Sequence, residues 1–545
     1  MKRYPSLDVM RGLAIFMMVV FHVIMRWYDR GWLEDGELEG VPIILLILMI
    51  VVIFFSGWAG FFLLVSAVSN MISMQKAVER GVTWKKLMLF QVGGGTLLLI
   101  AAIIVESTIG YHGYIGEAVK GELDKWPIIL YRGYHMETIH TIAMCIIING
   151  IVHSLLIRRG GHLKPLRNMK IYALLAGLVI VFTGPVYWLQ RRIIPGYPVE
   201  TWTPDLVGKS IEVQYAVIGE SSIGDILLKA IMLPFGALPE PLFPFLALSF
   251  IGSIIGINLT RGDRSLSFVR KGITIGSLMF LVGLFGTAAV LAFGIYDPGE
   301  FTNYFYQLPG LYPGAWLWWF LCLVGAQLAV VLLFMRMIEY RGKGRSFGKK
   351  TLFLRRYGFV AFSVYTFQFI DVLPRAVFQL FPDLASMYPY PKELSALLCL
   401  IMIPMTVLLW EVVLRLWEKV DFALGMEWWI AKAAEKLFPG KRVGTGKKLK
   451  WYQVKRLDPI GYLHKPEWLN VRKADHEAKE DSKLSLTLSV IGLLFYPLSL
   501  IGGVLAFKSR KLEGRNPYNR FASIIWIIST AITLFAIIIL SILRI

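Results

Sequence analysis

The chain has 545 residues, of which 56% are hydrophobic and 17% are charged, and its formal net charge is +20. A hydrophobic share this large excludes a soluble multidomain protein and indicates a polytopic membrane protein. The Lys and Arg residues lie in short connectors between apolar runs, so the charge reflects membrane topology rather than nucleic-acid binding. Single cysteines in three separate apolar runs exclude a disulfide framework and a CxxC metal site (Cys145, Cys322 and Cys399).

Apolar runs suited to membrane helices follow one another along the chain up to residue 417. They cover 8–28, 42–74, 87–106, 137–157, 171–190, 240–258, 272–294, 314–336, 357–379 and 393–417. We count 42–74 as one crossing, and we expect 8–28 to be retained because no small-residue cleavage pattern follows it. The sequence therefore predicts an all-α polytopic membrane helix bundle of about ten core transmembrane helices, plus a C-terminal membrane hairpin.

The charge distribution predicts a cell-membrane protein with a cytoplasmic N-terminus. With that orientation, the basic connectors near 76–86, 158–170, 260–271 and 341–356 all lie inside, as the positive-inside rule requires. The long connectors 107–135, 191–239 and 295–313 then lie outside. They are rich in Gly, Pro, Tyr and acidic residues, enough to build a cap over the outer mouth.

Beyond the core, the sequence divides into two further parts. We assign 1–418 to the transmembrane domain, 419–482 to a basic cytoplasmic linker, and 483–545 to a two-segment membrane hairpin. The runs 484–506 and 521–543 flank the basic stretch "KSRKLEGRNPYNR", which prefers the inside. A re-entrant hairpin that turns near Pro497 would place it there, whereas an ordinary two-helix hairpin would place it outside, and both arrangements stay open.

The interior of the first apolar run, residues 9–25, contains two ionisable residues, Arg11 and His22. They are eleven residues apart, so they share one helix face about 16 Å apart along the axis. Charged groups in a bilayer are costly and therefore mark function, although Arg11 could also snorkel to the interface and His22 could be a bonded bundle residue. Asp8, in the first turn after the expected N-cap Ser6, is explained by the helix dipole.

The segment "LDVMRGLAIFMMVVFHV" resembles the first-helix signature of the transmembrane acyltransferases. This superfamily joins acyltransferase family 3 to the heparan-α-glucosaminide N-acetyltransferase-like proteins. Its signature is an "LDxxRGxAxxxMVxxH" pattern, in which Arg11 and His22 occupy the arginine and histidine positions. Further stretches are similar to later family helices, in family order: "GWAGFFLLVSAVSNMIS", "METIHTIAMCIIINGIV", "EPLFPFLALSFIGSIIG" and "YGFVAFSVYTFQFI".

Some positions depart from the family pattern. "QVGGGT" (Gln91 to Thr96) stands where an Arg pair is common, and Gln368 replaces the final histidine of the late helix. The resemblance covers the first ten runs and ends near residue 420.

The resemblance implies transfer of an acyl group, most simply acetyl, from cytoplasmic acyl-CoA to a hydroxyl or amine of an extracytoplasmic sugar or glycoconjugate. The polyanionic CoA would bind cations (Arg11, Lys85, Lys86, Arg355 and Arg356). His22 and His140 are the candidate catalytic residues, with His22 as general base or as acyl carrier. Ser66, Tyr365 and Gln368 are candidate substrate contacts, and no metal is expected.

Two other classes of function fit the same sequence. A transporter also has many spans with buried charges, although no repeat relates the two halves. A non-catalytic acyl-CoA sensor would agree with the departures at "QVGGGT" and Gln368. The expected partners are acyl-CoA, a sugar or glycolipid acceptor, the lipid bilayer and a second copy of the chain in a homodimer. Nucleic acid is not expected as a partner.

Overall fold

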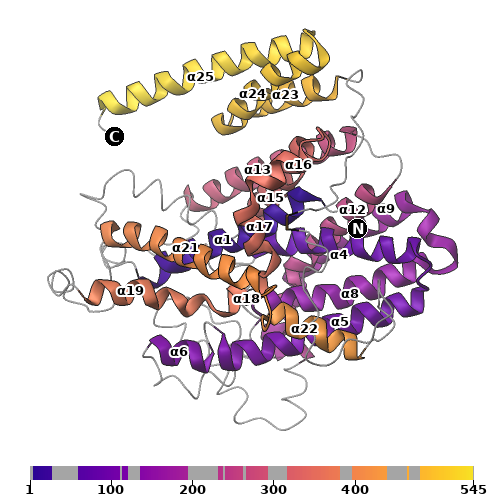
Figure 1. Ribbon diagram of the computed structural model, residues 1–545. Coiled ribbons are helices and arrows are strands. Elements are labelled where there is room, and N and C mark those ends of the chain that lie inside the picture. The colour runs from indigo at the N-terminus through magenta and orange to yellow at the C-terminus, as the bar shows by residue number, and fades with distance from the viewer. Residues whose placement is uncertain are drawn as a thin grey trace.

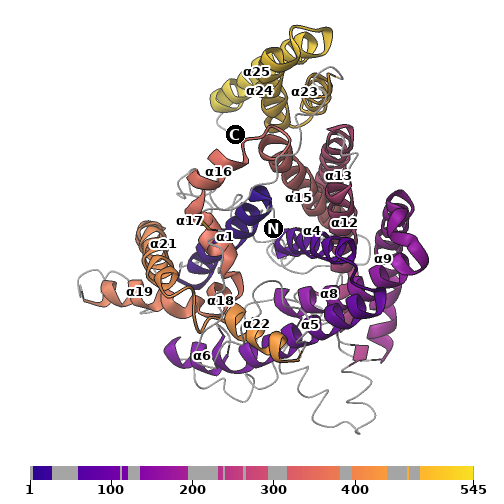
Figure 2. The same ribbon diagram turned by 45° about the vertical axis from the view of Figure 1, so that its right-hand side comes forward.

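The computed structural model describes residues 4–27, 59–110, 113–120, 136–193, 231–232, 234–236, 240–261, 266–292, 316–380, 396–437, 463–464 and 479–543. Within these ranges the elements are helices, and ten of them are long and apolar enough to cross a membrane. The predicted all-α polytopic bundle is therefore confirmed. Helix α1 (Pro5–Trp27) lies near its middle, between α4 and α21 (Figures 1 and 2).

The other elements follow α1 in chain order. They are α4 (Ala59–Glu79), α5 (Trp84–Ile104), the π-helix η1 (Val105–Ile109), α6 (Tyr114–Lys120), α8 (Thr138–Ile157), η4 (Arg158–Leu163), α9 (Pro165–Ile193), α12 (Leu242–Thr260), α13 (Leu266–Ala292), α15 (Trp316–Ile338), α16 (Gly344–Lys350), α17 (Leu352–Phe359), α18 (Ala361–Thr366), the 3₁₀ helix η6 (Gln368–Asp371), α19 (Val372–Gln379), α21 (Ala396–Lys419), α22 (Met426–Leu437), α23 (Glu480–Ile491), α24 (Tyr496–Glu513) and α25 (Pro517–Leu543).

Several helix ends meet at the start of α1, and we call this side of the molecule the Pro5 end. The Ser6 backbone N–H donates to Glu339 Oε1 at 2.9 Å, just after α15. The Tyr4 hydroxyl donates to the Leu259 carbonyl at 3.0 Å near the end of α12, and the Lys76 ammonium of α4 lies 5.8 Å from the Tyr4 ring centre. Ser6 lies inside the first turn of α1, so the expected N-cap role is wrong. The carboxylate of Glu339, distant in sequence, accepts its N–H instead.

Two glycines allow α1 and α17 to cross in close contact. A Cβ added to Gly12 would lie 1.7 Å from the Leu354 carbonyl oxygen, and one added to Gly358 would lie 2.6 Å from the Asp8 carbonyl oxygen. These neighbours are backbone atoms of the opposing helix, which cannot rotate away. The "RG" of the first-helix motif therefore has a packing role at Gly12 as well as a charge at Arg11.

The predicted helix at 357–379 is wrong as a single element. This region consists of α17, α18, η6 and α19, with breaks at Val360 (φ −120°, ψ 44°) and Phe367 (φ −99°, ψ 24°). Hydropathy alone indicates a continuous span, but Gly358 is pressed against α1 just before the first break. Non-helical backbone at membrane depth is tolerated where protein surrounds it, and Ala361, Ser363 and Val364 are all buried.

The stretch "QVGGGT" has a structural explanation in α5. A Cβ on Gly95 would lie 2.6 Å from Ile147 Cγ1 and 2.9 Å from the Ala143 carbonyl, and one on Gly150 would lie 2.2 Å from Gln91 Cβ. Helices α5 and α8 thus approach closely through small residues, as membrane helices often do. The small residues of "QVGGGT" therefore allow the close contact between α5 and α8.

The C-terminal part begins with a helical hairpin, α23 and α24, followed by α25, and the three form a group at one edge of the bundle (Figures 1 and 2). Helix α23 has 12 residues, about 18 Å of helix, which is too short to cross a bilayer. The Asp481 N–H donates to Glu513 Oε1 at 2.8 Å, so α24 returns to the end where α23 began. The geometry favours the re-entrant arrangement.

The same hairpin is fixed to the Pro5 end by buried charges. Asp481 pairs with Arg336 at the end of α15 and, at 2.9 Å, with Arg341. Both Asp481 and Arg336 are fully shielded, at 2% and 1% exposure, so removing either partner would leave a buried charge uncompensated. The basic stretch 508–520 therefore lies at the same end as the other basic connectors, which removes the conflict with the positive-inside rule.

Glu339 provides a prediction about pH. Its side chain is fully buried, and burial raises its pKa from 4.5 to about 7, although the hydrogen bond from the Ser6 N–H opposes this shift. Because the pKa of Glu339 is higher in the folded protein than in the unfolded one, the protein loses stability as pH rises from about 4.5 to about 7. Above about pH 7 this loss does not increase. Relative to wild type, Glu339→Gln should gain about 2–3 kcal/mol of stability between pH 5 and pH 8.

Thermal unfolding of the purified protein across this pH range measures the effect. Glu79→Gln, at the exposed end of α4, is the matched control and should track wild type. An unchanged difference in melting temperature between Glu339→Gln and wild type from pH 5 to pH 8 would contradict the assignment.

Candidate active site

Arg11 and His22 lie on one unbroken helix. Helix α1 carries Arg11 two turns from its start and His22 about 26 Å from Pro5, so the predicted separation along a single face holds. The His22 Nδ1 makes a short hydrogen bond with Gln368 Oε1 from η6. The broken segment thus brings a residue 346 positions away in sequence against the histidine.

The contacts of Gln368 determine which way its amide faces. Its Nε2 donates to the Tyr365 carbonyl at 2.9 Å and faces the Met18 sulfur at 3.7 Å, so Oε1 is the atom that faces His22. An amide oxygen only accepts, and His22 Nδ1 must therefore carry the proton. The other ring nitrogen, Nε2, then has the lone pair, which is the form required of a general base.

Three acidic residues interact electrostatically with Tyr365, and the sequence did not single them out. The Tyr365 hydroxyl hydrogen-bonds Glu106, and the charges of Glu137 and Glu240 also act on it. Glu106 is 2% exposed and lies in η1, a π-helical turn of the kind often found at functional sites. The sequence feature that could have identified Glu106 is an acidic residue at the end of the apolar run 87–106.

His140 lies in the first turn of α8, at the end of the bundle opposite the Pro5 end, as predicted. It is 1% exposed, and neither ring nitrogen has a hydrogen-bond partner among the described residues. Next to it, the Thr141 hydroxyl makes a short bond to the Glu240 carbonyl, and the Glu240 N–H donates to the Met136 carbonyl at 3.0 Å. The start of α8 is therefore tied to the segment that leads into α12.

The predicted cofactor cations fall into two groups. Lys85 and Lys86 are at the start of α5, and the Lys85 ammonium lies 5.6 Å from the Trp84 ring centre. Arg11 lies on α1 one turn after Asp8, and the Asp8 carboxylate is 3.9 Å from Arg355 Nε, so Arg11 is next to the second group. Ser66, a predicted substrate contact, is half-buried on α4.

Arg355 and Arg356 form the second group, and both are engaged by the protein itself. Arg355 is 2% exposed and donates to the Leu463 carbonyl at 2.9 Å and to the Gly348 carbonyl at 3.2 Å. Arg356 pairs with Glu411 at 2.9 Å and with Glu418 at 2.8 Å, both from α21. A bound phosphate would have to compete with these carboxylates.

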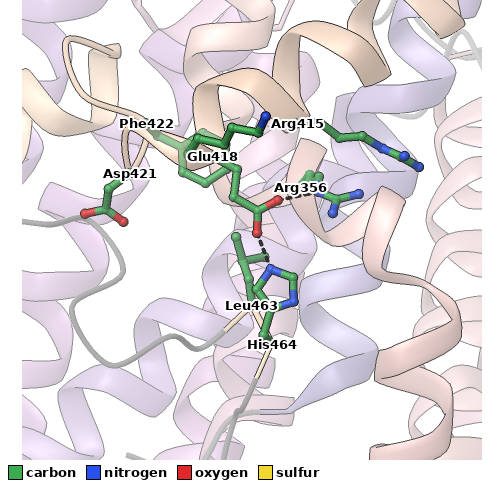
Figure 3. Close-up of a pocket in the computed structure, with 8 residues that line it drawn as sticks. Arg356, Arg415, Glu418, Asp421, Phe422, Leu463 and His464 are labelled. Carbon is green, nitrogen blue, oxygen red and sulfur yellow. Dashed lines mark hydrogen bonds and ion pairs between the residues drawn. The ribbon is translucent and has the colours of Figure 1, made fainter.

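Arg356 also lines a pocket of about 520 Å³ at the end of α21 (Figure 3). His464, from the part of the chain between α22 and α23, faces Glu418 across it and makes a short contact through Nε2. Arg415 and Lys419 contribute exposed cations, while Glu418 and Asp421 contribute carboxylates. The pocket is therefore of mixed charge rather than strongly basic.

Part of the chain matches the model of a known protein family. Residues 3–188 match the family model described as "Heparan-alpha-glucosaminide N-acetyltransferase, catalytic". Neither the curated proteins nor the solved structures compared gave a match. The match spans α1 to most of α9, so it includes Arg11, His22, Ser66, the two lysines of α5 and His140.

Residues 3–188 are therefore similar to the catalytic part of the N-acetyltransferase-like proteins, in agreement with the resemblance of the first-helix motif. The described residues also include ten helices long and apolar enough to cross a membrane, so the chain is a multi-pass membrane protein with an acetyltransferase-like segment. Arg355, Arg356, Tyr365 and Gln368 lie beyond the matched residues and are connected to the site by the structure alone.

Proposed function

We propose that the protein transfers an acyl group, most simply acetyl, from acyl-CoA on the cytoplasmic side to a hydroxyl or amine of a sugar or glycoconjugate on the other side. One observation carries the proposal. His22, in the matched first helix, donates from Nδ1 to Gln368, which places the lone pair on Nε2, and Gln368 in turn donates to the Tyr365 carbonyl. That arrangement suits deprotonation of an acceptor.

The tautomer of His22 sets the chemistry. His22 Nε2 accepts the proton of the acceptor hydroxyl or amine as its oxygen or nitrogen attacks the thioester carbonyl. When the C–S bond breaks, the CoA sulfur leaves as thiolate and takes that proton, which regenerates neutral His22. Gln368 keeps the ring oriented and, unlike a second histidine, cannot become charged next to the imidazolium.

The donor's phosphates require cations at the cytoplasmic side. We assign them to Arg11, the arginine of the first-helix motif, with Lys85 and Lys86 of α5. Arg355 and Arg356 contact carbonyl and carboxylate oxygens, and we assign them a structural role. The pantetheine arm would extend along α1 toward His22, over about 16 Å. His140, buried without a partner in the described structure, would contact the acceptor or share the proton transfer.

The test uses purified protein, radiolabelled acetyl-CoA and a panel of hydroxyl and amine sugars. The proposal predicts a labelled sugar product together with release of free CoA thiol. A transporter would produce neither, and a sensor would bind acetyl-CoA without releasing thiol. Absence of both products across the panel, with binding intact, would exclude the enzyme.

Membrane orientation gives a second prediction. Ser346 is exposed on α16, at the Pro5 end and within the basic connector 341–356, so this end should be cytoplasmic. A cysteine at this position should react with a membrane-impermeant maleimide only after cells are permeabilised. Labelling of Ser346→Cys in intact cells would reverse the orientation of the bundle.

A further inference from the structure

The connector between α21 and α22 has an unusual backbone. Asp421, Phe422 and Leu424 adopt left-handed conformations, with φ of 57°, 52° and 66°. Such φ values are costly for residues that carry a Cβ, and most of all for bulky ones. A connector with three of them persists only where its surroundings fix it.

Packing fixes this connector from two sides. The Phe422 side chain is fully buried between the rings of Phe359 in α17 and Trp417 in α21, with centroid distances of 5.4 and 6.0 Å. The Trp417 indole N–H donates to the Ala423 carbonyl at 2.7 Å. In Figure 3, Phe422 and Asp421 line the pocket beside Glu418. Strain held in place in this way indicates that the position of the next helix, α22, matters.

Glu427 lies in the first turn of α22, directly after this connector. Its Oε1 accepts the Phe362 N–H at 2.6 Å and the Ser363 N–H at 3.3 Å, and its Oε2 makes a short bond with the Ser363 hydroxyl. The Met426 N–H donates to the Ser363 Oγ at 2.8 Å. Because the chain breaks at Val360, these N–H groups begin a new helix and need acceptors from outside it.

The helix that begins there carries the site. Helix α18 has six residues, and Tyr365 lies near its end. The Tyr365 carbonyl accepts from Gln368 Nε2, and Gln368 Oε1 holds His22. A shift at Phe362 and Ser363 would therefore pass through one and a half turns of helix to the amide that orients the histidine.

We propose that Glu427 is a positioning residue: through Phe362 and Ser363 it fixes α18, and α18 fixes Gln368 against His22. This rests on the proposed function, since its effect is on the step that uses His22. Glu427 lies outside the matched family region and does not touch the site itself.

The test compares Glu427→Gln with Glu513→Gln. Glu513 accepts from the Asp481 N–H, the Ser482 N–H and the Ser482 hydroxyl at the start of α23, which is the same set of contacts away from the site. Glu427→Gln should lower kcat about tenfold with KM for acetyl-CoA within about twofold, because misplaced catalytic groups cost turnover. Glu513→Gln should leave both unchanged. Ser363→Ala is a milder change at the same contact and should lower kcat less than Glu427→Gln does. It replaces Glu427→Gln in the test if that variant fails to fold.

Two readouts separate positioning from general damage. In a double-mutant cycle, Glu427→Gln should have little further effect in a Gln368→Ala background, because both act through the same contact. Equal loss in both backgrounds would overturn the proposal.

Hydrogen exchange of the peptide covering 361–368 should rise in Glu427→Gln and not in Glu513→Gln. Unchanged exchange there would also overturn it, and this measurement stands even if no acyl transfer is found.

Discussion

Replacing His22 by Ala should abolish turnover while leaving CoA binding nearly unchanged. The imidazole acts at the thioester end of the donor, and loss of a general base typically lowers the rate about 10²–10⁴-fold. Replacing Arg11 by Ala should instead weaken CoA binding about 10–100-fold, because a charge-assisted phosphate contact is lost. Calorimetry with CoA and a radiolabelled transfer assay on both variants measure the two effects.

The controls are exposed residues of the same kind at the Pro5 end. His162→Ala in η4 and Arg345→Ala in α16 remove an imidazole and a guanidinium that have no assigned role. Both should behave as wild type in both assays. Wild-type turnover in a folded His22→Ala variant would show that the histidine only packs, and the mechanism would be wrong.

A methyl group added at Gly12 should destabilise the bundle more than a methyl group at Gly94. The Cβ of Gly12→Ala would meet the Leu354 carbonyl at 1.7 Å, which forces α1 and α17 apart. Overpacking typically costs about 1–3 kcal/mol, and contact with a fixed backbone places this variant at the upper end or beyond. Gly94→Ala meets nothing within 4 Å and should be neutral or slightly stabilising, since Ala favours helix.

Thermal unfolding and the yield of monodisperse protein measure the difference between the two glycine variants. Gly358→Ala, on the other side of the same crossing, should resemble Gly12→Ala. If Gly12→Ala melts at the same temperature as Gly94→Ala, then α1 and α17 do not cross as closely as described.

Most of the helices and the first-helix pair could be predicted from the sequence. Their signals are local: apolar length defines a span, and the eleven-residue interval from Arg11 to His22 defines a face. The break at Val360 could not be predicted, because hydropathy does not report that Gly358 must pass α1 at backbone contact. The role of Gln368 depends on that break.

Charge alone does not show which groups a cation contacts. Arg355 and Arg356 follow a basic connector and look suited to phosphates, but their partners, including Leu463 and Glu411, are more than fifty residues away in sequence. For the C-terminal hairpin, the sequence contained a conflict between helix counting and the basic stretch 508–520. The contact between Asp481 and Glu513 joins the two ends of a hairpin that hydropathy shows as one run, and so favours the re-entrant arrangement.

The central claim is acyl transfer across the membrane, and sided proteoliposomes test it most directly. Radiolabelled acetyl-CoA is supplied only to the face that exposes Ser346, and the amino and hydroxyl sugars are trapped on the opposite face. We expect label on the trapped sugar in wild type and none in His22→Ala, while intact acetyl-CoA stays on its own side. Entry of labelled acetyl-CoA into the trapped volume, or no labelled sugar with folded wild-type protein, would contradict transfer across the membrane.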